Sequence, residues 1–300
     1  MNKNIVLPNS IQAWVLAARP KTLAGAATPV LIGSALAFME NQYKLLPSLI
    51  CLLFALLMQV AANFINDLFD HLKGSDREDR LGPKRACAEG WITPQQMKKG
   101  ILITLLIACL LGLSLIYWGG WWLISIGILC VAFAFLYTAG PYPLAYHGWG
   151  DLLVLLFFGF VPVGGTFYIQ TNSWNYKVTL ASIICGLIVN TLLVVNNYRD
   201  YEQDKRSGKK TLIVRFGKRF GERLYLILGL AAAWLSLGFI IDGHLFAALL
   251  PQLYIFPHMQ TWRKLVKIEQ GSELNQLLGE SSQNMLLMAI LLSLGMMLSY

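Results

Sequence analysis

Long apolar stretches, separated by short polar segments, run through almost the whole chain. Nine of them approach the roughly 20 residues that an α-helix needs to cross a bilayer, and they lie at about residues 23–39, 46–66, 101–117, 121–138, 151–170, 178–197, 222–241, 243–257 and 284–299. The eighth is the weakest, because Pro251 interrupts it. The pattern predicts an all-α membrane protein of about nine transmembrane helices, forming a single domain over residues 1–300.

The composition favours lipid over water as the surroundings of this chain. Its 300 residues are 56% hydrophobic and 13% charged, whereas about 25% of the residues in a soluble domain are charged. Between Gly100 and Arg199 the formally charged side chains are Asp151 and Lys177. So few charges cannot cover a soluble core, so we expect most of the chain to lie in a lipid bilayer.

The basic residues fall almost entirely on one side of the membrane if the nine predicted helices alternate in direction. Of the 24 Lys and Arg residues, Lys44 and Lys177 alone fall on the other side. Cytoplasmic loops are rich in Lys and Arg, so we expect a multi-pass protein of the bacterial plasma (inner) membrane with a cytoplasmic N-terminus and an external C-terminus. The net charge of +8 would also suit nucleic acid, but no nucleic-acid-binding pattern accompanies it. Anionic headgroups and a phosphorylated substrate are the expected partners.

Residues 1–22 precede the first predicted transmembrane helix as a cytoplasmic or interfacial arm. Apolar residues recur there at helical spacing, after a potential cap at Ser10, at Ile11, Trp14, Val15 and Ala18. We expect a short interfacial anchor helix, with a substrate gate as the alternative.

Polar side chains replace apolar ones at the cytoplasmic ends of the second and sixth predicted helices. With roughly 100° between neighbouring helical residues, one stripe on the second helix contains Asn63, Asn66, Asp67 and Asp70. The corresponding stripe on the sixth helix contains Asn190, Asn197, Asp200 and Asp204. A carboxylate that faces lipid costs about 2.5–3.5 kcal/mol, so we expect both stripes to face a polar cavity inside the bundle.

The two stripes have the chemistry of a magnesium and diphosphate site. Proteins usually hold Mg²⁺ with one or two carboxylates together with phosphate oxygens of a substrate. Basic residues that could grip phosphate follow the first stripe (Lys73, Arg77, Arg80, Lys84 and Arg85) and the second (Lys205, Arg206, Lys209 and Lys210). Each segment alone is compatible with an ordinary solvated loop. Their recurrence favours a site, and it predicts two related halves around residues 23–140 and 151–257.

Two spaced pairs, Asn66 with Asp70 and Asp200 with Asp204, resemble the Asn-x-x-x-Asp and Asp-x-x-x-Asp signatures of the UbiA superfamily of intramembrane prenyltransferases. The resemblance covers essentially the whole chain and is strongest to the members that prenylate 1,4-dihydroxy-2-naphthoate. It extends to residues 18–23, 70–83, 140–144, 164–166 and 197–212. One position departs from the wider superfamily, whose first motif often has another Asp where this chain has Gly74. Asp76 and Asp79 follow closely and could compensate.

The resemblance implies a UbiA-like bundle around a central cavity and a Mg²⁺-dependent prenyltransferase. The implied reaction moves a polyprenyl group from polyprenyl diphosphate to 1,4-dihydroxy-2-naphthoate with loss of CO₂ and diphosphate. It gives demethylmenaquinone, or the phylloquinone precursor from a phytyl donor. The implied Mg²⁺ ligands are Asn66, Asp70, Asp76, Asp79, Asp200 and Asp204, of which Asp70, Asp76, Asp200 and Asp204 are the catalytic carboxylates. Residues implied to bind substrate are Asn63, Arg77, Arg80, Asn197, Arg199 and Lys209.

Other residues are candidates for contact with the organic parts of the substrates. Tyr142 and Tyr146 could shelter an allylic cation, and Asp151 could orient an acceptor hydroxyl. Tyrosines of a membrane-interface belt are an equal alternative. Arg19 and Lys21 could pair with the acceptor carboxylate or simply anchor the first helix.

Two other functions stay open at the level of sequence. The same scaffold could prenylate another aromatic acceptor, such as 4-hydroxybenzoate or homogentisate, and 4-hydroxybenzoate would react without decarboxylation. A membrane transporter would use the carboxylates as an ion path, which requires acidic residues near the midplane and the outer side. The carboxylates cluster at cytoplasmic helix ends, which favours the enzyme.

Overall fold

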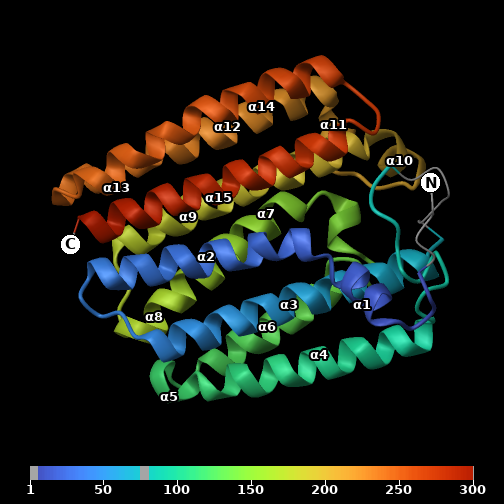
Figure 1. The fold of residues 1–300 in the computed structure, drawn as a ribbon, viewed down its shortest axis with the longest axis horizontal. Coiled ribbons are helices and arrows are strands. Elements are labelled where there is room, and N and C mark those ends of the chain that lie inside the picture. Colours follow the sequence, from blue (N-terminus) through green and yellow to red (C-terminus); the bar gives the residue numbers. More distant parts are fainter. Residues whose placement is uncertain (1–5, 75–80, 300) are drawn as a thin grey trace.

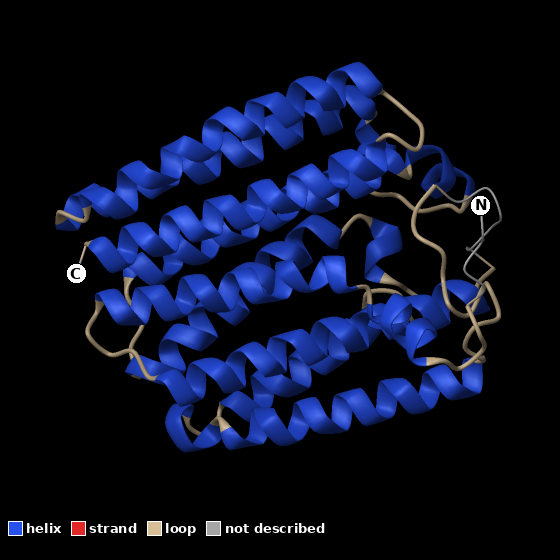
Figure 2. Ribbon diagram, viewed as in Figure 1, coloured by secondary structure: helices blue, strands red, loops and turns tan. Residues whose placement is uncertain are grey.

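The computed structural model describes residues 6–74 and 81–299. Within them all regular structure is helical, and the long helices lie side by side in one bundle (Figure 2). The first half forms α1 (Ile11–Ala18), α2 (Pro20–Met39), α3 (Leu45–Leu72), α4 (Pro94–Ser114), α5 (Ile116–Gly119) and α6 (Leu123–Leu136). The second half forms η1 (Leu144–His147), α7 (Gly150–Val154), the π-helical η2 (Leu155–Gly164), α8 (Gly165–Thr171), α9 (Tyr176–Arg199), α10 (Tyr201–Arg206), α11 (Leu212–Phe216), α12 (Lys218–Ser236), η3 (Leu237–Asp242), α13 (Leu245–Leu249), η4 (Leu250–Tyr254), α14 (Ile255–Ile268) and α15 (Leu274–Leu298). The predicted all-α class is confirmed.

Seven helical segments of the described chain are long and apolar enough to cross a membrane: Pro20–Met39, Leu45–Leu72, Pro94–Gly119, Gly150–Thr171, Tyr176–Arg199, Lys218–Asp242 and Leu274–Leu298. The shorter α6 is also apolar. The predicted eighth stretch is divided among α13, η4 and α14, and η4 has Pro251 in its first turn, where the missing N–H is tolerated. A multi-pass membrane protein is therefore confirmed, while the count of nine crossings stays a prediction.

Local sequence explains where several helices begin. The Ser10 hydroxyl accepts a hydrogen bond from the Ala13 N–H at 3.2 Å, so the predicted cap of α1 is confirmed. Thr93 and Gln96 form a reciprocal capping box at the start of α4. The Asn175 side chain caps α9 in a similar way.

Close contact between η2 and α9 fixes the second half of the bundle. A Cβ on Gly159 would lie 2.5 Å from the Ser182 carbonyl oxygen, and one on Gly186 would lie 3.0 Å from the Leu155 Cα. Small residues are needed wherever helix backbones approach this closely. The apolar core around this contact joins residues of α2, η2, α9, α12 and α15. It fixes α7 and α9 relative to each other, and both carry polar residues of the site.

A second core fixes the end of α3. Ala13 and Ala17 of α1 are buried against Phe64 and Leu68 of α3 and Met97 of α4. Of the residues predicted to share one apolar face, Trp14 and Ala18 pack partly against this core, whereas Ile11 and Val15 are exposed. Exposed apolar residues on α1 are what an interfacial helix requires.

The outer face and the two ends of the bundle match a membrane protein. Leu102, Leu106, Leu110 and Leu113 form an exposed row on α4, where lipid is the expected contact. Figure 1 shows α1, α10 and α11 at one end, and α5 with the C-terminal end of α15 at the other. At that second end Lys177 forms an ion pair with Glu40 and lies 3.6 Å from Asp242, which ties α2, α9 and η3 together.

Candidate active site

The first predicted stripe lies in the last turns of α3. This helix continues to Leu72, beyond the end predicted from hydrophobicity. Asn63, Asp67 and Asp70 are buried, and Asn66 is half-buried. The hydrophobicity pattern placed the helix end too early, because it treats polar side chains as solvent-exposed although these are buried against protein. Their buried oxygen atoms need polar partners.

Asn63 holds the junction between α1 and α2. Its Nδ2 donates to the Ala18 carbonyl at 2.8 Å and to Thr22 Oγ1 at 2.9 Å. Gln59 Nε2 donates to its Oδ1 at 3.2 Å. The amide is therefore fully engaged within the protein, which differs from the expected contact with the substrate.

The two basic residues predicted near the acceptor carboxylate lie at this same junction. Arg19 is half-buried and adopts φ 53° between α1 and α2, where Pro20 begins the second helix. Lys21 lies in the first turn of α2 and is exposed. Their pairing with an acceptor carboxylate stays a prediction.

Asp67 positions an arginine that faces Asp70. Its two carboxylate oxygens accept hydrogen bonds from the backbone N–H groups of Ala86 and Cys87, each at 2.9 Å. Arg85, the residue before this pair, donates from Nη2 to Asp70 Oδ2 at 3.0 Å. Both charged side chains are buried. The sequence placed Asp67 in the stripe and Arg85 in the basic loop, but no sequence signal joined them.

The second stripe does not continue along one helix as predicted. The helix α9 ends at Arg199, and Asp200 forms the turn (φ −88°, ψ 8°) that leads into α10. The Asp204 N–H still donates to the Asp200 carbonyl at 2.7 Å, so the two aspartates stay one turn apart. Asn197 is buried within the last turn of α9.

Arg199 explains the break after α9. Its Nε and Nη2 donate to the two carboxylate oxygens of Asp200, each at 2.7 Å. Its remaining donors reach Asn196 Oδ1 at 2.8 Å and Asn275 Oδ1 at 3.1 Å. A bidentate pair of this kind fixes both charges, so Arg199 orients Asp200, whereas the sequence predicted a direct contact with substrate.

Tyr146 of η1 joins the two stripes. Lys73 Nζ and Lys209 Nζ each lie 4.9 Å from its ring centroid. Its hydroxyl lies 3.5 Å from Asp70 Oδ1, and Lys209 Nζ lies 3.6 Å from Asp204 Oδ1. The structure thus brings residues of both motifs, which are far apart in the sequence, around one aromatic ring.

Lys73 is held in place beside the first stripe. Its Nζ donates to the Thr138 carbonyl at 2.5 Å, and the Thr138 hydroxyl donates to Asn66 Oδ1. Partial removal from water lowers the pKa of Lys73 below its ordinary value; Asp70 opposes this effect and Lys209 adds to it.

The segment around η1 is docked onto the loop that follows the second motif. The Lys210 N–H donates to the Tyr146 carbonyl at 2.8 Å, and Arg215 Nη2 donates to the His147 carbonyl at 2.6 Å. Gly148 has φ +85°, and a Cβ there would lie 2.8 Å from the Lys210 carbonyl oxygen. Tyr142 is exposed and stacks on His147. Tyr146, but not Tyr142, is therefore drawn into the carboxylate region.

The motif carboxylates are paired with basic residues. Among the described residues, no three His, Cys, Asp or Glu side chains gather closely enough to hold one ion. The pairs are Asp70 with Arg85, Asp200 with Arg199, and Asp204 with Lys209. Asp76, Arg77, Asp79 and Arg80 lie outside the described residues. Oxygen ligands on two separate elements suit Mg²⁺ ions that are also bound by phosphate oxygens of a substrate.

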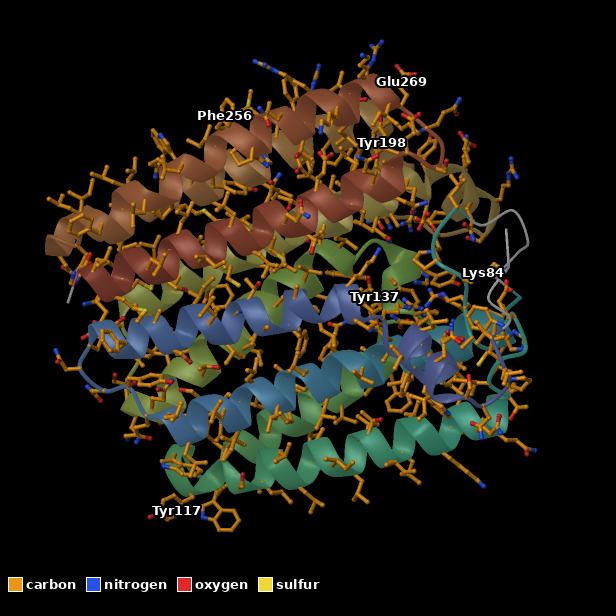
Figure 3. The ribbon with its side chains drawn as sticks, viewed as in Figure 1. Lys84, Tyr117, Tyr137, Tyr198, Phe256 and Glu269 are labelled. Atoms are coloured by element: carbon orange, nitrogen blue, oxygen red, sulfur yellow. The ribbon has the colours of Figure 1, made fainter. Side chains whose placement is uncertain are left out.

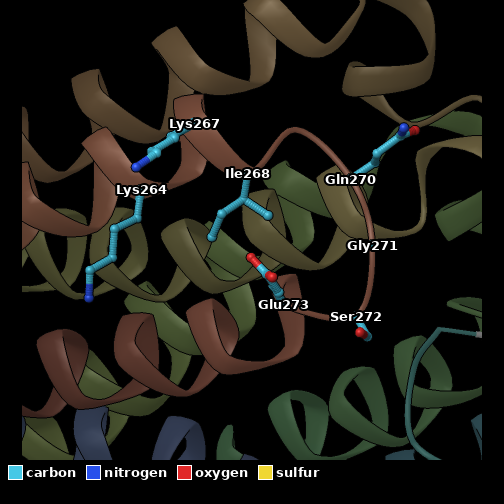
Figure 4. Close-up of a pocket in the computed structure, with 7 residues that line it drawn as sticks. All are labelled: Lys264, Lys267, Ile268, Gln270, Gly271, Ser272 and Glu273. Atoms are coloured by element: carbon cyan, nitrogen blue, oxygen red, sulfur yellow. The ribbon is translucent and has the colours of Figure 1, made fainter.

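A separate hollow lies under the loop between α14 and α15. Its volume is about 550 Å³, and it is lined by Lys264, Lys267, Ile268, Gln270, Gly271, Ser272 and Glu273 (Figure 4). None of the motif residues lines it, so it is distinct from the carboxylate region.

Comparison with known proteins adds an independent finding. The sequence profile of the UbiA prenyltransferase family matches residues 26–277. The 1,4-dihydroxy-2-naphthoate octaprenyltransferase of Haemophilus influenzae is 36% identical over 99% of this chain and 100% of its own. A UbiA homolog from Archaeoglobus fulgidus has a similar fold, with a TM-score of 0.68 at 16% identity over 95% of this chain and 99% of its own. A structure of such a homolog bound to DMAPP and Mg²⁺ gives a TM-score of 0.58 at 13% identity over 93% and 99% of the two chains.

Proposed function

This chain belongs to the UbiA prenyltransferase family, and from that premise we propose that it transfers a polyprenyl group from polyprenyl diphosphate to 1,4-dihydroxy-2-naphthoate. The full-length similarity to a curated enzyme with this acceptor supports the choice of substrate. The observation that carries the chemistry is the meeting of both motifs around Tyr146, with Lys73 and Lys209 beside its ring.

The proposed reaction balances without an added oxidant or proton. The C–O bond between the prenyl chain and diphosphate breaks, and diphosphate keeps the electron pair. A C–C bond forms between the prenyl carbon and the ring carbon that carries the carboxylate. The bond from ring to carboxylate then breaks, CO₂ leaves, and its electron pair restores the aromatic ring.

Asn66, Asp70, Asp200 and Asp204 are the described residues that would hold Mg²⁺ with the diphosphate. When bound, Mg²⁺ withdraws charge from the departing diphosphate. The donor set fits this ion, because it consists of amide and carboxylate oxygens without sulfur or imidazole ligands. The metal and its ligands remain a proposal for this chain.

The chain's own cations would neutralise the leaving group. Lys73 follows the first motif and Lys209 follows the second, and both lie over the Tyr146 ring. Their donors would bind phosphate oxygens in a site that lies against an apolar bundle, where charge interactions are stronger than in water. The same bundle would exclude water from the allylic cation.

The proposed orientation has the N-terminus in the cytoplasm and the C-terminus outside, in a bacterial plasma membrane. It is supported by the described Lys and Arg residues, which gather near α1, α10 and α11, apart from Lys44 and Lys177 near the other end. The substrate phosphate would then be drawn from the cytoplasmic side.

The proposal is tested with purified protein in detergent, Mg²⁺, a polyprenyl diphosphate and 1,4-dihydroxy-2-naphthoate. We expect prenylated product, CO₂ and diphosphate in equal amounts, and loss of all three in Asp70→Ala and Asp200→Ala variants. Faster reaction with 4-hydroxybenzoate, without CO₂, would move the assignment to another acceptor. Ion or solute flux in sealed vesicles without any product would favour a transporter instead.

A further inference from the structure

Three further polar residues form a cluster that the proposed diphosphate chemistry does not use. Tyr137 follows α6, Asp151 lies in the first turn of α7, and Asn190 lies within α9. Tyr137 is half-buried and is labelled in Figure 3. The cluster therefore draws its residues from α7, α9 and the segment that follows α6.

Asn190 has a buried oxygen without a partner. Its Nδ2 donates to the Asp151 carbonyl at 3.0 Å. A carbonyl can only accept, so this bond fixes which end of the amide faces α7. The other end, Oδ1, is buried and has no hydrogen-bond partner within the described chain, and the side chain is only 4% exposed. A buried acceptor left without a donor costs about 1–3 kcal/mol, so a ligand that supplies the donor is the physical expectation.

Asp151 is a carboxylate without a countercharge. It lies in the membrane-spanning segment Gly150–Thr171, where its carboxylate accepts a hydrogen bond from its own backbone N–H but is in no ion pair with a described residue. A carboxylate in such a segment is costly, and it is usually kept for function. Its side chain is half-buried.

Tyr137 connects this carboxylate with the two motifs. A Cβ on Gly150 would lie 3.6 Å from the Tyr137 hydroxyl oxygen, so that hydroxyl lies within van der Waals contact of the start of α7. Thr138, the next residue, contacts Lys73 and Asn66, and the Tyr137 carbonyl accepts a hydrogen bond from the Ala145 N–H at 3.0 Å, next to Tyr146. The cluster thus adjoins the place where both motifs would hold the diphosphate.

We propose that Tyr137, Asp151 and Asn190 bind the hydroxyl groups of the aromatic acceptor. The Asp151 carboxylate and the free Asn190 oxygen supply two hydrogen-bond acceptors, which match the two O–H donors of a dihydroxyarene. The Tyr137 hydroxyl donates a hydrogen bond to an oxygen of the aromatic substrate. A hydrogen bond from the phenol to a carboxylate also raises the electron density of the ring that attacks the prenyl carbon.

This inference rests on the proposed function and adds to it the groups that select the acceptor. The variants Tyr137→Phe, Asp151→Asn and Asn190→Leu remove one polar function each with little change of volume. Ser182→Ala is the matched control, because Ser182 is also on α9 and has a buried oxygen without a partner, but it lies against Gly159, two turns from Asn190.

The measurements are KM for each substrate and the inhibition constant of 1-hydroxy-2-naphthoate, which lacks one hydroxyl. In Asp151→Asn we expect the acceptor KM to rise about 10- to 100-fold, as for loss of a hydrogen bond to a charged group. In Tyr137→Phe and Asn190→Leu we expect about 3- to 10-fold. The KM for prenyl diphosphate stays unchanged and thereby reports an intact fold. The preference for the dihydroxy acceptor over the monohydroxy inhibitor falls in at least one variant.

The possible failures are distinguishable. A wild-type protein that does not prenylate 1,4-dihydroxy-2-naphthoate would overturn the proposed function itself. An active wild type whose three variants keep the acceptor KM within twofold would overturn the acceptor cluster alone. A parallel rise of the prenyl diphosphate KM would assign these residues to the donor site, and an effect of Ser182→Ala equal to theirs would reduce them to general packing.

Discussion

Replacing Asp67 with Asn tests whether the first motif depends on a carboxylate that binds the backbone of the Arg85 loop. The carboxylate accepts from the N–H groups of Ala86 and Cys87 at 2.9 Å each, and this holds Arg85 against Asp70. In Asp67→Asn one oxygen becomes an NH₂ group, which faces a backbone N–H and cannot accept. The other bond remains but loses its charge.

The magnitude follows from these two bonds. A hydrogen bond to a charged group contributes about 1.5–3 kcal/mol, and a neutral one about half as much. Losing one bond and weakening the other therefore destabilises the Arg85 loop by about 2–4 kcal/mol. At about 1.4 kcal/mol per factor of ten, kcat/KM for prenyl diphosphate should fall at least tenfold.

The assay is steady-state prenylation at saturating acceptor, with prenyl diphosphate and Mg²⁺ varied in turn. We expect the donor KM and the Mg²⁺ requirement to rise, while the acceptor KM stays constant. Asp242→Asn is the control, because it removes a carboxylate that pairs with Lys177 at the opposite end of the bundle. Unchanged donor kinetics in Asp67→Asn, or equal losses in both variants, would refute the positioning role.

Three further outcomes follow from the same geometry. The pKa of Lys73 lies below that of an ordinary lysine, so its charge is present at low pH and lost as pH rises through that lowered pKa; donor binding should weaken there, and Lys73→Arg should move the weakening to higher pH. Gly148→Ala should lower thermal stability by about 1–3 kcal/mol, because φ is +85° and the new Cβ would meet the Lys210 carbonyl at 2.8 Å; an unchanged melting temperature would contradict this. Chelation with EDTA should abolish turnover and added Mg²⁺ should restore it, with Asp200→Asn needing about tenfold more Mg²⁺ for half-maximal rate; turnover that persists without metal would remove Mg²⁺ from the proposal.

The apolar stretches predicted the membrane helices well, because side chains that face lipid must be apolar and hydropathy measures this property directly. The exposed row from Leu102 to Leu113 on α4 is such a case. The same measure fails at the end of α3, where Asn63 and Asp67 are buried against neighbouring segments of the protein. It does not foresee the turn at Asp200 either, where Arg199 binds both carboxylate oxygens of Asp200.

In the candidate site, the sequence predicted which residues take part, but it did not predict which residues contact one another. Helical spacing placed Asp70, Asp200 and Asp204 in two polar stripes, and the family resemblance implied their roles and that of Lys209. Neither could join Asp67 to Arg85 or Asn190 to Asp151, since these contacts depend on how loops and helices pack. The two related halves also stay a prediction, because a repeated motif does not by itself show repeated structure.

The pairing of charges in the two motifs bears on how the donor would enter. Asp70, Asp200 and Asp204 are paired among the described residues with Arg85, Arg199 and Lys209. Because these cations are already paired, a diphosphate that bound alone would bring uncompensated negative charge into a partly buried site, which costs several kcal/mol. A diphosphate accompanied by Mg²⁺ avoids that cost. The donor should therefore bind as its magnesium complex, and its dissociation constant should weaken steeply as free Mg²⁺ is withdrawn, even in Asp151→Asn protein whose acceptor site is impaired. Equal donor affinity with and without Mg²⁺ would show that the basic residues alone suffice.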